Sequence, residues 1–234
     1  FLFLFFMKKA LVTGGAGFIG SNLVDSLIKN GLEVVVIDNL STGSVQNINS
    51  KATFLNYDLS CVSINVLAGI FQDIDVVFHL AALARVQPSI DDPIPYNAAN
   101  VSATLNVLYA ASKSKVSRVV YSASSSCYGD SETVPQCEED PTNPLSPYGL
   151  QKYIGEQYCR MFSHVYNLDT VCLRYFNVYG ERMSLEGAYC LVTGIFARQM
   201  KQGKPLTITN DGHQRRDFTY VGDVVQANIL AAKY

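Results

Sequence analysis

The sequence predicts an α/β protein with a doubly wound parallel sheet, that is, one covered by helices on both faces. Two observations support this fold class. Apolar runs of strand length alternate with longer segments of helical periodicity over residues 7–176. The strand-length runs are apolar at nearly every position, which is typical of parallel strands buried on both faces. Ligands of such sheets bind at the carboxyl ends of the strands.

The expected elements follow in regular order along the chain. The expected strands cover residues 9–13, 33–37, 52–55, 75–80, 118–122 and 170–174. The expected helices cover residues 18–28, 98–112 and 148–166. After residue 176 the alternation loosens and glycine and polar residues become denser. We therefore expect one domain over 7–176 and a smaller substrate lobe over 177–234.

Both ends of the chain suggest additions or losses. Residues 1–6 are all Phe or Leu and precede Met7. A membrane-spanning helix needs about 20 apolar residues, so we interpret them as a non-native leader. The chain stops within an expected helix at 227–234. We therefore expect the second lobe to be truncated, with apolar surface exposed near Phe196 and Val224.

The composition bounds the function. The 234 residues include 48% hydrophobic and 16% charged residues, with a net charge of −2. This balance gives no basic surface for nucleic acid or for an anionic membrane. The six cysteines form no CxxC pair and no His-linked metal spacing. We expect reduced thiols in a cytoplasmic protein, and no metal.

A glycine-rich turn joins the first expected strand to the first expected helix. Gly14 permits a tight turn, Gly17 lets the backbone approach a pyrophosphate, and Gly20 allows close packing of helix on strand. The helix then opens with Phe18 and Ile19, whose N–H groups would face the phosphates. The strand, loop and helix come in the right order for a dinucleotide-binding Rossmann fold.

An acidic residue ends the second expected strand. Asp38 follows the last glycine by about 20 residues, where a carboxylate accepts hydrogen bonds from the adenosine ribose. Such a carboxylate repels a 2′-phosphate, so NAD is favoured over NADP. Asn39 could soften this preference, but no Arg or Lys lies nearby. Asp58, after the third strand, either reaches the adenine edge or is a solvated loop acid.

A phenol, an ammonium and a hydroxyl form the candidate catalytic set. Tyr148 and Lys152 lie four residues apart and therefore on one helix face. A free phenol has a pKa near 10, and a neighbouring ammonium favours its ionised form. Residues 124–126 are three serines that leave a strand end, where a hydroxyl could share the substrate proton. The alternative for these serines is a polar exit from the strand.

The sequence resembles the extended short-chain dehydrogenase/reductase family. Within that family it resembles the UDP-hexose and UDP-N-acetylhexosamine 4-epimerases, which are of the NAD-dependent epimerase/dehydratase kind. The matching pieces occur in the family's order across nearly the whole chain. They are residues 13–20, 38–40, 79–82, Asn100, 122–129, 148–152, 173–177 and 216–221.

The resemblance implies roles for individual residues. Tyr148 is the acid/base, Lys152 holds the nicotinamide ribose, and Ser124 lies beside the sugar 4-hydroxyl, with Ser125 contacting the sugar. The expected cofactor-binding residues are Gly14, Gly17, Phe18, Ile19, Gly20, Asp38, Asn39, Asp58, Leu59, Ala81, Asn100, Tyr148, Lys152 and Tyr175. The expected substrate-binding residues are Ser124, Ser125, Tyr148, Asn177 and Arg216.

Asn177 and Arg216 would hold the UDP diphosphate, since an arginine forms charge-assisted bonds to phosphate. The alternative for Arg216 is a surface arginine paired with Asp217. His79 ends an apolar strand and is interpreted as structural.

The implied reaction is NAD-dependent epimerisation at C4 of a UDP-hexose or UDP-N-acetylhexosamine through a transient 4-keto sugar. A 4,6-dehydratase or decarboxylase of the same fold needs acids just after the catalytic hydroxyl, where this chain has Ser125 and Ser126. A reductase and a non-catalytic NAD-binding regulator remain alternatives. The sugar stays open. Residues 84–86 lie where the family has its substrate loop, and residues 187–192 resemble the N-acetylhexosamine enzymes more than the simple hexose enzymes. A homodimer is expected.

Overall fold

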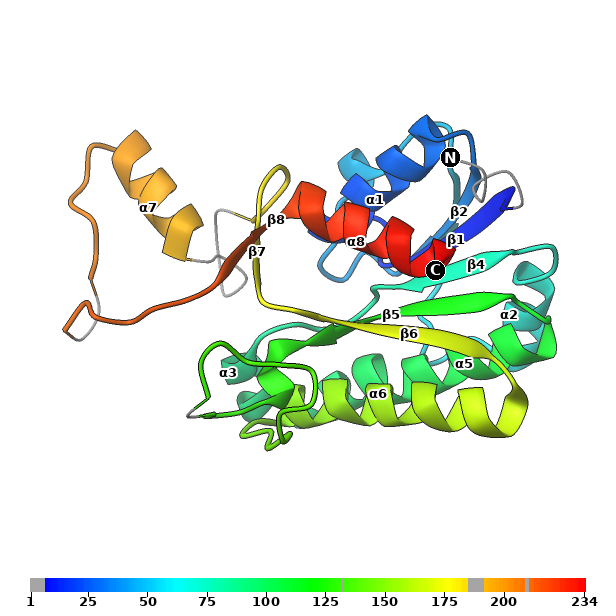
Figure 1. Ribbon diagram of the computed structural model, residues 1–234. Helices are drawn as coiled ribbons and strands as arrows, with labels where there is room; N and C mark the ends of the chain where they lie inside the picture. Colours follow the sequence, from blue (N-terminus) through cyan, green and yellow to red (C-terminus); the bar gives the residue numbers. More distant parts are fainter. Residues whose placement is uncertain (1–6, 132, 185–191, 209–210) are drawn as a thin grey trace.

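The computed structural model of the chain describes residues 7–131, 133–184, 192–208 and 211–234. Its main sheet has six parallel strands in the order β3-β2-β1-β4-β5-β6 (Figure 1). The strands are β1 (Lys9–Thr13), β2 (Glu33–Asp38), β3 (Thr53–Asn56), β4 (Val76–His79), β5 (Arg118–Ser124) and β6 (Asp169–Tyr175). This order is that of the doubly wound dinucleotide-binding fold, so the predicted fold class is confirmed.

Helices cover both faces of this sheet (Figure 1). One face carries α1 (Phe18–Lys29) and α8 (Val221–Lys233), which pack against each other. The other carries α2 (Ile64–Ile70), α5 (Ala103–Lys113) and α6 (Pro147–Tyr166). Each face buries its own apolar cluster, because strand side chains alternate between the two faces: Val12 and Val36 lie in one, Leu11 and Ile37 in the other.

The six expected strands are all present, with ends that differ by at most two residues. The helix expected over 98–112 has a more complex form. A π-helix, η2 (Ala98–Ser102), precedes α5, and two short helices that were not predicted come before it, α3 (Val86–Asp91) and α4 (Pro93–Asn97). A π turn inside a helix is frequent at functional sites, and this one contains Asn100.

The region after residue 176 holds a small second sheet. Strands β7 (Asn177–Tyr179) and β8 (Phe218–Tyr220) pair in parallel, and α7 (Val192–Lys201) lies away from the main sheet (Figure 1). The predicted small second lobe is thus present. Its predicted boundaries, 7–176 and 177–234, stay a prediction. Residues 1–6, interpreted as a leader, lie outside the described residues.

The position of α8 corrects one expectation about exposed surface. This helix packs on α1, β5 and β6, and its Val225 and Ile229 join the apolar cluster of that face. Val224, which we expected to be exposed, is 4% exposed and packs against Val178. The expectation was wrong because it treated this helix as part of the second lobe alone.

Two glycines let α6 lie close to β5. A Cβ at Gly155 would collide with the phenol oxygen of Tyr121, and a Cβ at Gly149 would come within 2.7 Å of the backbone oxygen of Ser126. Tyr121 is 1% exposed, so its ring is enclosed by the core. The first turns of α6 therefore depend on glycine for their distance from the sheet.

We predict that Gly155→Ala lowers the free energy of unfolding by about 1–3 kcal/mol, the usual cost of overpacking a core. Gly69→Ala in α2 is the matched control, since nothing lies within 4 Å of its added Cβ. It should gain about 0.5–1 kcal/mol from helix propensity. Urea unfolding of both variants measures this, and equal stabilisation by the two would show that α6 does not rest on Tyr121.

Candidate active site

The predicted site residues gather where the parallel strands end. Thr13 ends β1 before the glycine turn, and Asp38 ends β2. His79 ends β4, Ser124 ends β5 and Tyr175 ends β6. Parallel strands carry their carboxyl ends to one edge of the sheet, so these residues share that edge.

The glycine turn has the geometry that a dinucleotide requires. Gly14 has a φ of +70°, and a Cβ there would lie 2.7 Å from the backbone nitrogen of Ala81. A Cβ at Gly20 would collide with the backbone oxygen of Gly14. Gly17 is the N-cap of α1 and has no side chain to cap the helix. The N–H groups of Phe18 and Ile19 therefore remain for an anion.

Asp38 binds the turn from the neighbouring strand. Its carboxylate accepts hydrogen bonds from the N–H of Ala16 at 3.0 Å and of Leu40 at 2.8 Å, and the side chain is 8% exposed. Each carboxylate oxygen can accept a further bond, so a ribose hydroxyl can still be bound. These contacts and the glycine cradle fit an NAD adenosine at this edge.

Asn39 and Asp58 lie next to each other at the ends of β2 and β3. The amide of Asn39 donates to the carboxylate of Asp58 at 3.2 Å. The hydroxyl of Ser60 also donates to this carboxylate, and this bond is the main reason that the pKa of Asp58 is lowered. Leu59 is 5% exposed, and its carbonyl accepts from the Asn106 amide at 2.9 Å.

His79 belongs to a buried chain of hydrogen bonds. Its Nδ1 lies 2.7 Å from the hydroxyl of Thr13, and its Nε2 lies 2.9 Å from the hydroxyl of Thr104. The Thr13 hydroxyl also accepts from the N–H of Ala81 at 3.1 Å. Burial lowers the pKa of His79 to about 3, so the ring is neutral. These contacts agree with the interpretation of His79 as structural.

Asn100 ties the loop after β4 to α6. Its amide accepts from the N–H of Leu83 at 2.8 Å and donates to the Leu83 carbonyl at 2.9 Å. It also donates to the side chain of Gln151, at 3.0 Å. The side chain is 1% exposed and uses these atoms within the protein. Its predicted place beside the cofactor stays a prediction.

Ser124 and Tyr148 are brought together. Ser124 begins the 3-10 turn η3 (Ser125–Cys127) and accepts from the N–H of Ser126 at 3.2 Å. Burial raises the pKa of the Tyr148 phenol, while a hydrogen bond from Ser124 and the charge of Arg85 lower it by less. The phenol by itself is thus held in its protonated form at neutral pH.

Lys152 is buried, at 3% exposed, with its Nζ 4.6 Å from the centre of the Tyr121 ring. Burial lowers its pKa to about 8. The net shift of the phenol pKa is upward, because burial outweighs the opposing effects of Ser124 and Arg85. The predicted joint effect of the Lys152 ammonium and the cationic nicotinamide on the phenol stays a prediction.

The remaining predicted residues lie around the end of β6 and the second sheet. The Tyr175 hydroxyl accepts from Ser122 at 3.1 Å and from the Asn228 amide at 2.6 Å. The Asn177 amide donates to the carbonyl of Asp217 at 3.0 Å. Arg216 is exposed and its guanidinium donates to the Arg215 carbonyl at 2.6 Å. The pairing of β7 with β8 therefore places Asn177 next to the neighbour of Arg216.

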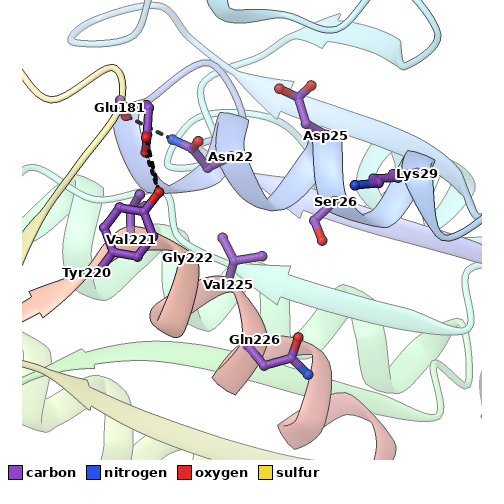
Figure 2. A pocket seen from close by; sticks show the side chains of 10 residues that line it. All are labelled: Asn22, Asp25, Ser26, Lys29, Glu181, Tyr220, Val221, Gly222, Val225 and Gln226. Carbon is purple, nitrogen blue, oxygen red and sulfur yellow. Dashed lines mark hydrogen bonds between the residues drawn. The ribbon is translucent and has the colours of Figure 1, made fainter.

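A surface cavity of about 310 Å³ lies elsewhere, between α1 and α8 (Figure 2). Tyr220 donates to the carboxylate of Glu181 at its rim. Its lining residues are Asn22, Asp25, Ser26, Lys29, Glu181, Tyr220, Val221, Gly222, Val225 and Gln226. None of them is a predicted site residue.

Other structural features bear on the remaining expectations. Cys127 and Cys159 are buried free thiols, and Cys61, Cys137 and Cys172 are also free. Within the described ranges, no helix combines the length and apolar character needed to cross a membrane. Residues 187–191, most of the segment that resembles the N-acetylhexosamine enzymes, lie outside the described residues.

Comparison with known proteins identifies the family. Residues 10–234 match the family model described as NAD dependent epimerase/dehydratase family. A UDP-glucose 4-epimerase of Mycolicibacterium smegmatis is 39% identical over 230 residues, which cover 95% of this chain and 72% of that protein. The chain belongs to the NAD dependent epimerase/dehydratase family, and the predictions of family and cofactor are confirmed.

Two solved structures show the same fold over nearly the whole chain. One is a UDP-N-acetylglucosamine 4-epimerase from Methanobrevibacter ruminantium in complex with UDP-N-acetylmuramic acid, with a TM-score of 0.92 and 41% identity over 97% of this chain and 73% of that one. The other is a UDP-glucuronic acid 4-epimerase from Bacillus cereus in complex with UDP-glucuronic acid and NAD, with a TM-score of 0.86 and 37% identity over 97% and 74%. The relatives thus share a reaction at C4 and differ in the sugar.

Three features of the site were not predicted. Two are contacts: Ser89 accepts from the N–H of Tyr148 at 3.1 Å, and Gln151 binds Asn100. The third is that the charge of Arg85 lowers the pKa of the phenol, against the larger effect of burial. The position of Arg85 in the sugar-side loop was the one available signal. The other two contacts join segments far apart in sequence, and no local pattern marks them.

The His79 network predicts a pH dependence of stability. Its folded pKa of about 3 lies below the ordinary value of 6.5, so between these values the unfolded chain binds a proton that the folded chain does not. Stability is therefore lost as pH falls below 6.5, by about 1.4 kcal/mol per pH unit. His79→Asn should remove this part of the slope in urea unfolding measured between about pH 4 and 7. Equal slopes for the two proteins would contradict the assignment.

Proposed function

We propose that the chain catalyses epimerisation at C4 of a UDP-hexose or UDP-N-acetylhexosamine. The observation that carries this proposal is the meeting of Ser124 at the end of β5 with Tyr148 and the buried Lys152 in the first turns of α6, at the sheet edge that carries the glycine turn. A hydroxyl paired with a phenol beside a dinucleotide can remove the proton of a sugar hydroxyl. Relatives named as 4-epimerases of three UDP-sugars support the choice of carbon.

The residues that would hold NAD follow from the geometry of the edge. The N–H groups of Phe18 and Ile19 would bind the pyrophosphate, with Gly14 and Gly17 allowing its approach. Asp38 would accept from the adenosine ribose, Asn39 and Asp58 would lie at the adenine, and Lys152 would hold the nicotinamide ribose. Bound NAD would supply hydride transfer at C4, and its cationic ring would favour the phenolate.

The protein's own part in the reaction is proton transfer and positioning. Tyr148 would take the proton of the 4-hydroxyl through Ser124. It would return this proton after the 4-keto sugar has rotated in the site to present its other face. Burial raises the pKa of the phenol, so the proton is held firmly until nearby positive charge favours its release.

Asn177 and Arg216 would bind the UDP diphosphate, and Ser125 would contact the sugar. Holding the diphosphate orients the distant C4 atom toward the phenol. Ser125 and Ser126 form the turn after β5, where a dehydratase or decarboxylase would need an acid. The absence of an acid at Ser125 and Ser126 favours epimerisation over dehydration and decarboxylation. The predicted cytoplasmic location stays a prediction.

A homodimer is also proposed. Helix α6 exposes Leu150, Met161, Val165 and Tyr166 by 36–59% of their surface. A second copy could cover this apolar face, because buried apolar area drives association. Light scattering measures the molar mass in solution and should give that of a dimer. A monomeric mass at micromolar concentration would contradict the proposal.

We predict that Tyr148→Phe lowers turnover by about 10²-fold or more, because the acid/base group is lost. NAD binding should persist, since the phenol oxygen is not needed to hold the cofactor. Tyr153→Phe on the same helix is the matched control and should keep its turnover. Products formed from UDP-glucose, UDP-N-acetylglucosamine and their 4-epimers are identified by NMR. Near-normal turnover by Tyr148→Phe would refute the assignment.

We further predict that Asp38 selects NAD. The parent should bind NAD more tightly than NADP, because the carboxylate repels a 2′-phosphate. Asp38→Asn keeps the shape and removes the charge, so calorimetry should show a narrower ratio of the two dissociation constants. Glu33→Gln, at the other end of β2, is the control. If the parent bound NADP more tightly than NAD, a residue other than Asp38 would determine the cofactor preference.

A further inference from the structure

The loop that follows β4, residues 80–85, contacts the glycine turn at its beginning. The hydroxyl of Thr13 accepts from the N–H of Leu80 and from the N–H of Ala81, each at 3.1 Å. The turn itself lies so close that a Cβ at Gly14 would be 2.7 Å from the backbone nitrogen of Ala81. The start of this loop is therefore fixed to the turn that would bind the pyrophosphate.

Two residues further on, the same loop is held by Asn100. The Oδ1 atom of Asn100 accepts from the N–H of Leu83 at 2.8 Å, and its Nδ2 donates to the carbonyl of Leu83 at 2.9 Å. A backbone N–H can only donate and a carbonyl can only accept, so these two contacts settle which end of the amide is the oxygen. Asn100 is 1% exposed, and its orientation is fixed.

The second hydrogen of this amide goes to α6. Nδ2 of Asn100 also donates to Oε1 of Gln151, at 3.0 Å. Gln151 is 5% exposed, follows Tyr148 by three residues on the same helix and directly precedes Lys152. An amide nitrogen has two hydrogens, so Leu83 and Gln151 together use both of them. Hydrogen bonds therefore run from the loop through Asn100 to the part of α6 that carries the phenol and the ammonium.

We propose that Gln151 is a positioning residue of the acid/base centre. By accepting from Asn100, it fixes the loop at Leu83 to the helical turn between Tyr148 and Lys152. This inference rests on the proposed function, in which Tyr148 is the acid/base. Gln151 lay outside the set of site residues predicted from the sequence.

The reaction depends on the relation that this connection fixes. NAD would be held by the glycine turn at one end and by Lys152 at the other, while Tyr148 acts on the sugar. Thr13 joins the turn to the loop, and Gln151 joins the loop through Asn100 to α6. Losing the second joint lets the helix and the turn shift relative to each other, and small errors of orientation slow a reaction strongly.

The first test measures the joint itself by the exchange of backbone N–H groups with deuterium, followed by NMR. Gln151→Met keeps the length of the side chain and removes its acceptor. Exchange at Leu83 should become faster by about 3–10-fold, the effect of losing one ordinary hydrogen bond. Exchange at Ala81 should stay unchanged, because Thr13 still holds that N–H. Gln151→Glu keeps an acceptor oxygen and should restore slow exchange at Leu83.

The second test measures turnover of the NAD-loaded chain. Gln151→Met should lower kcat by about tenfold and leave KM for the UDP-sugar within about twofold, because the diphosphate would be bound by other elements. Its pH profile should stay in place, since glutamine carries no charge. Gln157→Met makes the same change at a partly exposed position of α6 and should leave kcat and the exchange at Leu83 as in the parent.

The two tests separate this inference from the proposed function. Absence of turnover by the parent with every UDP-sugar refutes the function, and the exchange at Leu83 still shows whether Gln151 holds the loop. Unchanged exchange at Leu83 in folded Gln151→Met, or an equal increase in Gln157→Met, would overturn the inference. Faster exchange with an unchanged kcat in an active enzyme would also overturn it, because Gln151 would then hold the loop without positioning the reaction.

Discussion

The close approach of α6 to β5 is the constraint on which the site depends. It is possible because Gly155 faces the phenol of Tyr121 and Gly149 faces the backbone oxygen of Ser126. At this spacing the first turn of α6 brings Tyr148 to Ser124, and the second turn buries Lys152 over the Tyr121 ring. The same burial lowers the pKa of Lys152 and raises that of the Tyr148 phenol. The close packing of α6 on β5 therefore determines both the positions of Tyr148 and Lys152 and the shifts of their pKa values.

Buried polar side chains connect the two halves of the edge. Thr13 and His79 link the glycine-turn strand to the loop after β4, and Asn100 links that loop to α6. All three are at most 1% exposed, and their hydrogen bonds are made within the protein. Buried polar groups of this kind fix one arrangement, because any shift would leave them unpaired. The cofactor side and the phenol side are thus held in a fixed relation.

Much of the fold and the candidate site could be predicted because its signals are local. The apolar runs, the glycine turn and the four-residue spacing from Tyr148 to Lys152 lie within single elements. Helices α3 and α4 were missed because Pro88, Pro93 and Pro95 interrupt any helical pattern, and β7 and β8 have three residues each, too few to show a period. The contact of Ser89 with Tyr148 joins residues 59 positions apart, and the effect of Arg85 on the phenol arises only from the fold.

In the proposed reaction the sugar is reversibly oxidised at C4, and Tyr148 takes and returns the proton of the 4-hydroxyl. It is tested most directly by turnover of a UDP-sugar that carries deuterium at C4, with NMR of the products and absorbance of the cofactor followed together. The account predicts a C4 epimer that keeps its deuterium at C4, with no net formation of NADH. Stoichiometric NADH, or a 4-keto-6-deoxy sugar as the accumulated product, would contradict it.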